Sequence, residues 1–279
     1  MRRKEKIRET NFEQKERPRT RLAQYFDVFR HNFVELLKLS LLQTVFNMPL
    51  IATLVTFWLF IGYAAPYGLG ASMTVFLITA GALLLSMMSS FTGMTGSFYC
   101  LKKICFAEGE YASSSFFIGL RDEWKKGLLT GFIVGLSAAV ALIGFFFSYF
   151  YLSQVNVTIS GLGIAVVIIQ FMVVLMVAYY TISQVIVYDN KYRYVLKNSF
   201  IMTLMRFHIN LLLFIIHPGI IIALAVIMDI TMYVSLPIIV LFICFFHLIW
   251  VCNTLGAFDK FINKENHPEI YLKGLYKEG

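Results

Sequence analysis

Charged residues are scarce in this chain of 279 residues, and long stretches contain none. Asp, Glu, Lys and Arg together make up 14% of the sequence, whereas 58% of the residues are hydrophobic. No acidic or basic residue occurs at 39–101 or at 127–188, and Asp229 alone interrupts the stretch 207–258. Soluble domains do not contain such stretches, so the sequence predicts a membrane protein.

Each uncharged stretch is long enough for two transmembrane helices of about 20 residues. Short, almost uncharged turns at 63–71, 153–161 and 229–232 divide the three stretches. The sequence therefore predicts an all-α helical bundle with six transmembrane spans. The expected spans are residues 36–62, 72–97, 127–152, 162–187, 208–228 and 233–257.

Basic residues are absent from all three turns. The 24 Lys and Arg residues lie in the segments 1–38, 102–126, 191–206 and 260–277. Because cytoplasmic segments are enriched in Lys and Arg, we expect a multi-pass protein of the cell membrane with both termini in the cytoplasm.

This topology predicts three parts of the chain. Residues 1–21 form a disordered basic cytoplasmic tail that either lies near the anionic headgroups of the lipid bilayer or is solvated and serves only to fix the topology. Residues 22–258 form the membrane domain, and residues 259–279 form a cytoplasmic carboxyl-terminal tail. A net charge of +8 follows from this topology, and nothing in the tail resembles a nucleic-acid-binding module.

Three segments share a pattern centred on Arg30, Arg121 and Arg206. In each segment an apolar residue precedes the Arg and another follows it three positions later. The pattern predicts amphipathic cytoplasmic helices at the membrane interface, with Trp124 at headgroup level. An internal repeat would produce this pattern, and so would chance similarity among interfacial helices.

Glycine recurs every fourth residue within the expected third span, at Gly127, Gly131 and Gly135, and Ala139 continues the stripe. Glycine costs a soluble helix about 1 kcal/mol relative to alanine. In lipid, small residues let helix backbones approach closely. The stripe indicates helix packing, either within the bundle, which we favour, or in a homo-oligomer.

Three polar residues lie at similar expected depth. Asn47, His217 and His247 are each roughly 14 to 17 Å from the cytoplasmic boundary at about 1.5 Å per residue. Polar groups at this depth are costly unless they have partners. They predict either a polar cavity that binds a ligand or relays a proton, or ordinary hydrogen bonds between helices, which are commoner.

Signatures of catalysis are missing. The sequence has no HExxH, no GxSxG and no phosphate-binding loop, and its four cysteines form no CxxC pair. We therefore expect no enzymatic activity, no metal and no cofactor. The expected spans also contain no acidic residue, which argues against an ion-coupled pump.

Three stretches carry a family resemblance: YFDVFRHNFVELLKLSLLQTVFNMPL, FTGMTGSFYCLKKICFAEGEYASSSFFIGLRDEWKKGLL and VYDNKYRYVLKNSFIMTLMRFHINLLL. Across residues 22–260 the chain resembles the YesL-like family of bacterial integral membrane proteins. That family lacks an established biochemical activity, and its genes often accompany sugar-uptake transporters. The resemblance implies an accessory or regulatory partner of a carbohydrate uptake system, in contact with a sugar transporter subunit.

Two functions of different class follow. An accessory protein requires a partner surface, and the candidates on the cytoplasmic side are Glu108, Glu110, Arg121, Trp124, Lys125 and Lys126. A small self-contained permease or channel for a neutral solute requires a polar path, and its candidates are Asn47, His217 and His247.

Overall fold

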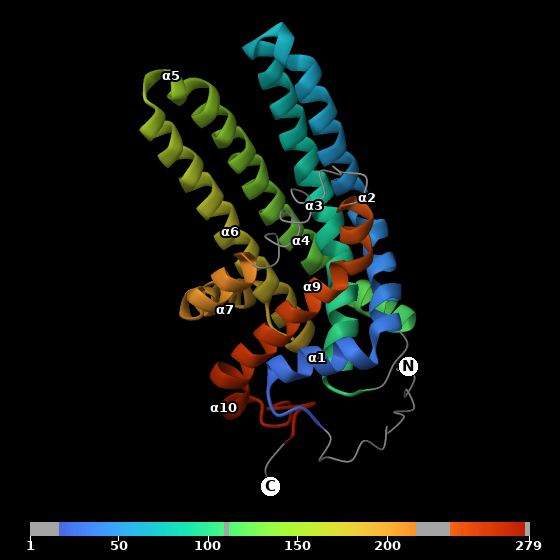
Figure 1. The fold of residues 1–279 in the computed structure, drawn as a ribbon. Coiled ribbons are helices and arrows are strands. Elements are labelled where there is room, and N and C mark those ends of the chain that lie inside the picture. Colours follow the sequence, from blue (N-terminus) through green and yellow to red (C-terminus); the bar gives the residue numbers. More distant parts are fainter. Residues whose placement is uncertain (1–16, 109–111, 216–234, 277–279) are drawn as a thin grey trace.

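The computed structural model describes residues 17–108, 112–215 and 235–276, which are mostly helical and contain no strand (Figure 1). The prediction of an all-α helical bundle is confirmed. The helices are α1 (Arg21–His31), α2 (Phe33–Ala64), α3 (Leu69–Cys105), α4 (Ala112–Phe147), α5 (Ser153–Val155), α6 (Val157–Val187), α7 (Tyr192–Met205), α9 (Ser235–Phe258) and α10 (Lys264–Asn266), with a further helical segment, Phe207–Ile215, after α7.

Among the described residues, five helices are long and apolar enough to cross a membrane, or six when α7 and Phe207–Ile215 count as one bent span. The helical segments α2, α3, α4 with the π-helical turn after it, and α6 contain the first four expected spans. Helix α9 coincides with the sixth expected span to within two residues at each end. The expected fifth span, 208–228, lies within the described residues only as far as Ile215.

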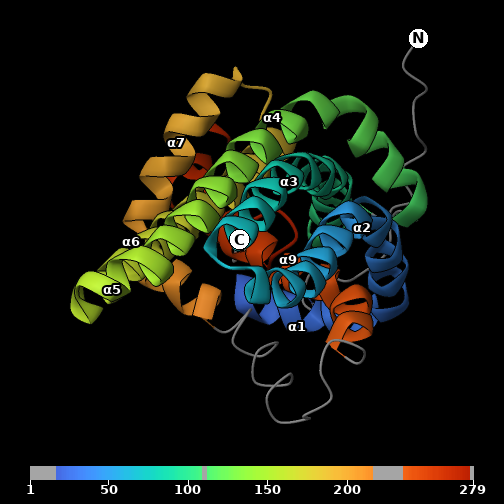
Figure 2. The same ribbon diagram turned by 90° about the horizontal axis from the view of Figure 1, so that it is seen from above.

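The helices are arranged with the interfacial elements at one end. Figure 1 shows α1 and α10 at one end of the bundle and α5 at the other. Helix α3 lies between α2 and α4, and α6 packs beside α4 (Figure 2). The charge pattern places α1 and α10 on the same side of the membrane, and these two helices lie at the same end of the bundle.

The chain breaks near two of the three repeated arginines. Helix α1 ends one residue after Arg30 and α2 begins at Phe33, while Arg206 lies at an 84° bend between α7 and Phe207–Ile215. Helix α4, by contrast, is continuous through Arg121. The three segments thus share a sequence pattern but not one local geometry.

The glycine stripe of α4 packs directly on the backbone of α3. A Cβ added to Gly131 would lie 2.6 Å from the carbonyl oxygen of Met87, and one added to Gly135 would lie 2.7 Å from the Cα of Leu84. A Cβ added to Gly127 would lie 2.6 Å from the Thr95 side chain and 2.9 Å from the carbonyl oxygen of Phe91. Because α3 covers these glycines, they serve contact within the bundle and are not available to a second copy.

The two ends of the described chain are joined by a buried ion pair. Arg21 Nη2 lies 2.7 Å from Asp259 Oδ2, and the two side chains are 10% and 7% exposed. The second carboxylate oxygen accepts hydrogen bonds from Asn263 Nδ2 at 2.9 Å and from the Leu272 amide at 3.2 Å. Both carboxylate oxygens of Asp259 are therefore paired, which is the condition for burying its charge.

This ion pair joins the end of one expected tail to the beginning of the other. Arg21 is the first residue of α1. Residues 259–276 lie at the same end of the bundle, and backbone hydrogen bonds form the turns in this segment.

Burial, with the carboxylates of Asp259 and Glu269 nearby, raises the pKa of the Tyr188 hydroxyl. The hydroxyl therefore stays protonated and donates a hydrogen bond to Asn263 Oδ1.

Glycine is required where the carboxyl-terminal segment meets α3. Gly274 has φ +81°, and a Cβ there would overlap the carbonyl oxygen of Cys105. The Gln24 amide donates to that same carbonyl oxygen and to the Gly274 oxygen. The segment after α10 is thereby fastened to both α1 and α3.

We predict that Gly131→Ala lowers the free energy of unfolding by about 1 to 3 kcal/mol, because the new methyl group would meet the α3 backbone, which cannot move as a side chain can. Gly81→Ala is the matched control, since nothing lies within 4 Å of its added Cβ. Unfolding in detergent can be followed with a thiol-reactive dye, because Cys100, Cys105, Cys244 and Cys252 are buried and free. Equal melting temperatures for the two variants would contradict the close contact.

Asp259→Asn should destabilise the protein by about 3 to 5 kcal/mol, because it leaves the buried Arg21 charge without its counter-ion. Asp122→Asn breaks an ion pair with Arg121 whose side chains are 84% and 53% exposed, so it should change stability by less than about 1 kcal/mol. The same dye assay compares the two variants. If both melt alike, the ion pair does not hold the ends of the chain together.

Candidate functional site

Two of the three candidate intramembrane polar residues line one cavity. Asn47 on α2 and His247 on α9 both border a cavity of about 530 Å³ among α2, α3, α6 and α9. His217 lies outside the described residues. The structure thus brings together the two candidates that it describes, and we call this space the polar cavity.

The polar cavity is lined mainly by apolar side chains. Its polar lining groups include Thr44, Asn47, Ser90, Tyr179 and His247. The His247 ring is buried beside Phe98 and Tyr179, with ring centroids 5.5 and 6.1 Å apart. Pockets that hold small molecules commonly combine apolar walls with a few polar groups in this way.

Asn47 has partners on its own helix and on α3. Its Oδ1 accepts hydrogen bonds from Gln43 Nε2 at 3.2 Å and from Ser90 Oγ at 2.6 Å. Gln43 Oε1 in turn accepts from Ser97 Oγ at 2.8 Å. The carbonyl end of Asn47 therefore links α2 to α3, as expected for a polar residue that holds helices together in lipid.

A second polar network lies among α6, Phe207–Ile215 and α9. Asn210 Oδ1 accepts from Tyr180 at 3.1 Å and from Asn253 Nδ2 at 3.0 Å, and Arg206 donates to the Asn253 carbonyl at 2.9 Å. None of these contacts was among the sequence-based site candidates. A search for every amide side chain within the expected spans would have found Asn210 and Asn253.

The His, Cys, Asp and Glu side chains of the described residues are dispersed. They contain no group of three His, Cys, Asp or Glu that could hold a metal ion. Cys105 and Cys252 approach to 3.9 Å between their sulfur atoms, and both thiols are buried. Among the described residues that line the polar cavity there is no carboxylate.

The candidate partner residues differ in their exposure. Glu108 forms an ion pair with Lys273, and Lys126 pairs with Glu123 at 2.9 Å. Glu110 lies outside the described residues. The exposed candidates are Arg121, Trp124 and Lys125, which we call the α4 surface.

The α4 surface combines an aromatic ring with two cations. The Arg121 side chain is 84% exposed and Trp124 is 44% exposed. Lys125 Nζ lies 5.7 Å from the centre of the Trp124 ring. Trp and Arg are enriched among the residues that contribute most to protein interfaces, and Trp also anchors proteins at membrane interfaces.

Comparisons with protein-family models, curated proteins and solved structures find no match to this chain. The chemistry of the polar cavity and the α4 surface therefore carries the functional inference.

Replacing Asn47 with Leu should lower the free energy of unfolding by about 1 to 2 kcal/mol, because the donors on Gln43 and Ser90 lose their shared acceptor. Thr56→Val is the control on the same helix, since the exposed Thr56 hydroxyl donates only to carbonyls of α2 itself. Unfolding in micelles by titration with a denaturing detergent measures both variants. The link between α2 and α3 is excluded if Asn47→Leu is as stable as Thr56→Val.

Proposed function

We propose that this chain is a non-enzymatic membrane protein that serves as an accessory or regulatory partner of a carbohydrate uptake system. The observation that carries the proposal is the α4 surface, where Trp124 and Arg121 are exposed. Exposed tryptophan beside exposed arginine is the composition of an interface centre.

The polar cavity supports an accessory role over direct sugar transport. A sugar carries many hydroxyl groups, and each needs a hydrogen-bonding partner when it leaves water. The cavity walls are mainly apolar, and the Asn47 carbonyl already accepts two hydrogen bonds from the protein. These groups suit a sugar pathway poorly, so we place the sugar in a partner protein.

The carbohydrate element of the proposal rests on the resemblance to the YesL-like family. The resemblance includes FFIGLRDEWKKGLL, the stretch that contains Arg121, Trp124 and Lys125. The stretch that resembles the family thus contains the exposed residues of the α4 surface, which makes a transporter subunit the partner to test.

A permease or channel for a small neutral solute is the second candidate. It is favoured by the volume of the polar cavity, about 530 Å³, and by the presence of Asn47 and His247 in its wall. The solute would be largely apolar, because the lining is.

The test is purification of the tagged chain in mild detergent from its native host, grown on a complex polysaccharide, with mass spectrometry of the proteins that remain bound. We predict a stoichiometric transporter subunit with the wild-type chain and a loss of at least about tenfold with Arg121→Ala/Trp124→Ala, the order expected when interface residues are truncated. Tyr63→Ala is the control, since it removes an exposed aromatic side chain from a different helix.

Purification without a transporter subunit would overturn the accessory proposal, as would equal recovery with the double variant and the control. In that case, solute flux in liposomes would test the permease, with His247→Leu as the variant of the cavity wall.

A further inference from the structure

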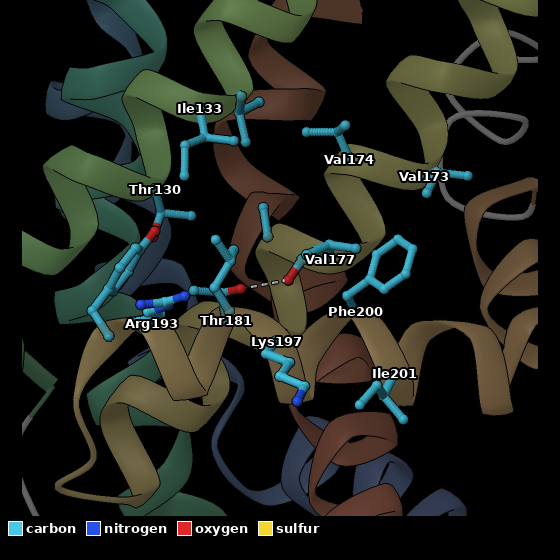
Figure 3. Close-up of a pocket in the computed structure, with 14 residues that line it drawn as sticks. Thr130, Ile133, Val173, Val174, Val177, Thr181, Arg193, Lys197, Phe200 and Ile201 are labelled. Carbon is cyan, nitrogen blue, oxygen red and sulfur yellow. Dashed lines mark hydrogen bonds between the residues drawn. The ribbon is translucent and has the colours of Figure 1, made fainter.

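An apolar groove lies among α4, α6 and α7, apart from the polar cavity and the α4 surface. Its volume is about 540 Å³. Ile133 and Val134 of α4 form one wall, and Val173, Val174 and Val177 of α6 form another (Figure 3). A groove between membrane helices with such walls is complementary to a hydrocarbon chain.

Helix α7 supplies two cations at one edge of this groove. Arg193 and Lys197 are one helical turn apart, and both line the groove beside Phe200. Figure 3 shows them below Ile133, Val173 and Val174, toward the end of the bundle that carries α1. Within the described part of the chain, neither cation takes part in an ion pair or a side-chain hydrogen bond.

A hydrogen bond joins α4 to α7 in the lining of the groove. The hydroxyl groups of Thr130 and Tyr192 lie 2.9 Å apart. Thr130 also donates to the carbonyl of Lys126 at 2.8 Å, so Tyr192 is the donor in the bond between the two helices. This bond ties the first turn of α7 to α4 and places Arg193 at a defined edge of the groove.

The position of the cations along the bundle matches headgroup depth. Helix α7 follows the end of α6 directly and belongs to a segment that the charge asymmetry assigns to the cytoplasmic side. The valines that line the groove are on α6. They lie farther into the bundle than the cations of α7, on the side of the hydrocarbon core (Figure 3). Basic pockets between membrane helices on this side are known binding places for anionic lipid headgroups.

We infer that the groove binds an anionic phospholipid of the cytoplasmic leaflet. One acyl chain lies against Val173, Val174 and Val177, and the phosphate is held by Arg193 and Lys197. A lipid satisfies both features at once, since its chain fills the apolar space and its phosphate pairs the two cations. A soluble anion gains nothing from the valines, and an apolar partner helix leaves the cations unpaired. This inference does not depend on the proposed function.

The test is a lipid titration of the purified full-length chain by native mass spectrometry, with phosphatidylglycerol and phosphatidylcholine of identical acyl chains. We predict tighter binding of phosphatidylglycerol to the wild type. Arg193→Gln/Lys197→Gln should weaken that binding about 25-fold and abolish the preference. The matched control is Arg19→Gln/Lys264→Gln, which removes two exposed cations at the same end but outside the groove.

A third variant tests the place of the acyl chain. Val177→Phe adds a ring to the groove wall and should weaken the binding of both lipids, while its melting temperature in the dye assay reports whether the fold is retained. Equal affinity of the wild type for the two lipids would overturn the inference, and so would an unchanged preference in Arg193→Gln/Lys197→Gln. Unchanged binding to folded Val177→Phe would place the lipid elsewhere and overturn it as well.

Discussion

The close contact between α3 and α4 is the constraint on which the rest of the bundle depends. Lipid supplies little hydrophobic force between helices, so association requires van der Waals contact over a long seam. The glycines of α4 provide that seam by letting the backbone of α3 approach at Met87. Beyond the stripe, aromatic rings replace glycine, and Phe76 packs on Phe146 with centroids 4.8 Å apart. The pair α2–α3 and the pair α4–α6 accordingly diverge toward the end that carries α5 (Figure 1).

The spans could be predicted from the sequence because the bilayer imposes a length on each helix and makes charge costly within it. The bend after α7 could not. The apolar residues of Phe207–Ile215 suit a span. Its 84° angle to α7, however, occurs where Arg206 donates a hydrogen bond to the Asn253 carbonyl of α9, a contact distant in sequence. The ion pair of Arg21 and Asp259 escaped prediction for a related reason. The two residues are 238 positions apart, and the sequence around either one does not indicate which distant residue it pairs with.

The grouping of Asn47 with His247 could be proposed from the sequence, whereas the hydrogen-bonding partners of Asn47 could not. Counting residues from the membrane boundary placed Asn47 and His247 at one level, because a helix rises by a constant amount per residue. Which groups would meet Asn47 depended on the rotation of α2 against α3, which the hydrogen bonds of Gln43 with the Ser90 carbonyl and the Ser97 hydroxyl help to determine. The same limitation applied to the partner surface. In the sequence, Glu108 was as good a candidate for contact with a partner protein as Trp124. In the structure, Glu108 forms an ion pair with Lys273 of the carboxyl-terminal segment.

Helix α4 connects the seam, the groove and the exposed surface. Gly131 faces α3, while Thr130 and Ile133 face the groove. Because the glycine contact joins backbone to backbone, α4 cannot turn without displacing α3. The groove therefore has one wall, α4, that is held firmly by α3, whereas α7 at its edge packs mainly on α6. A lipid between these walls would add contacts to α7 on its least supported side, and its phosphate would supply the counter-charge that the described chain does not. In this arrangement an anionic lipid would act as part of the packing of α7.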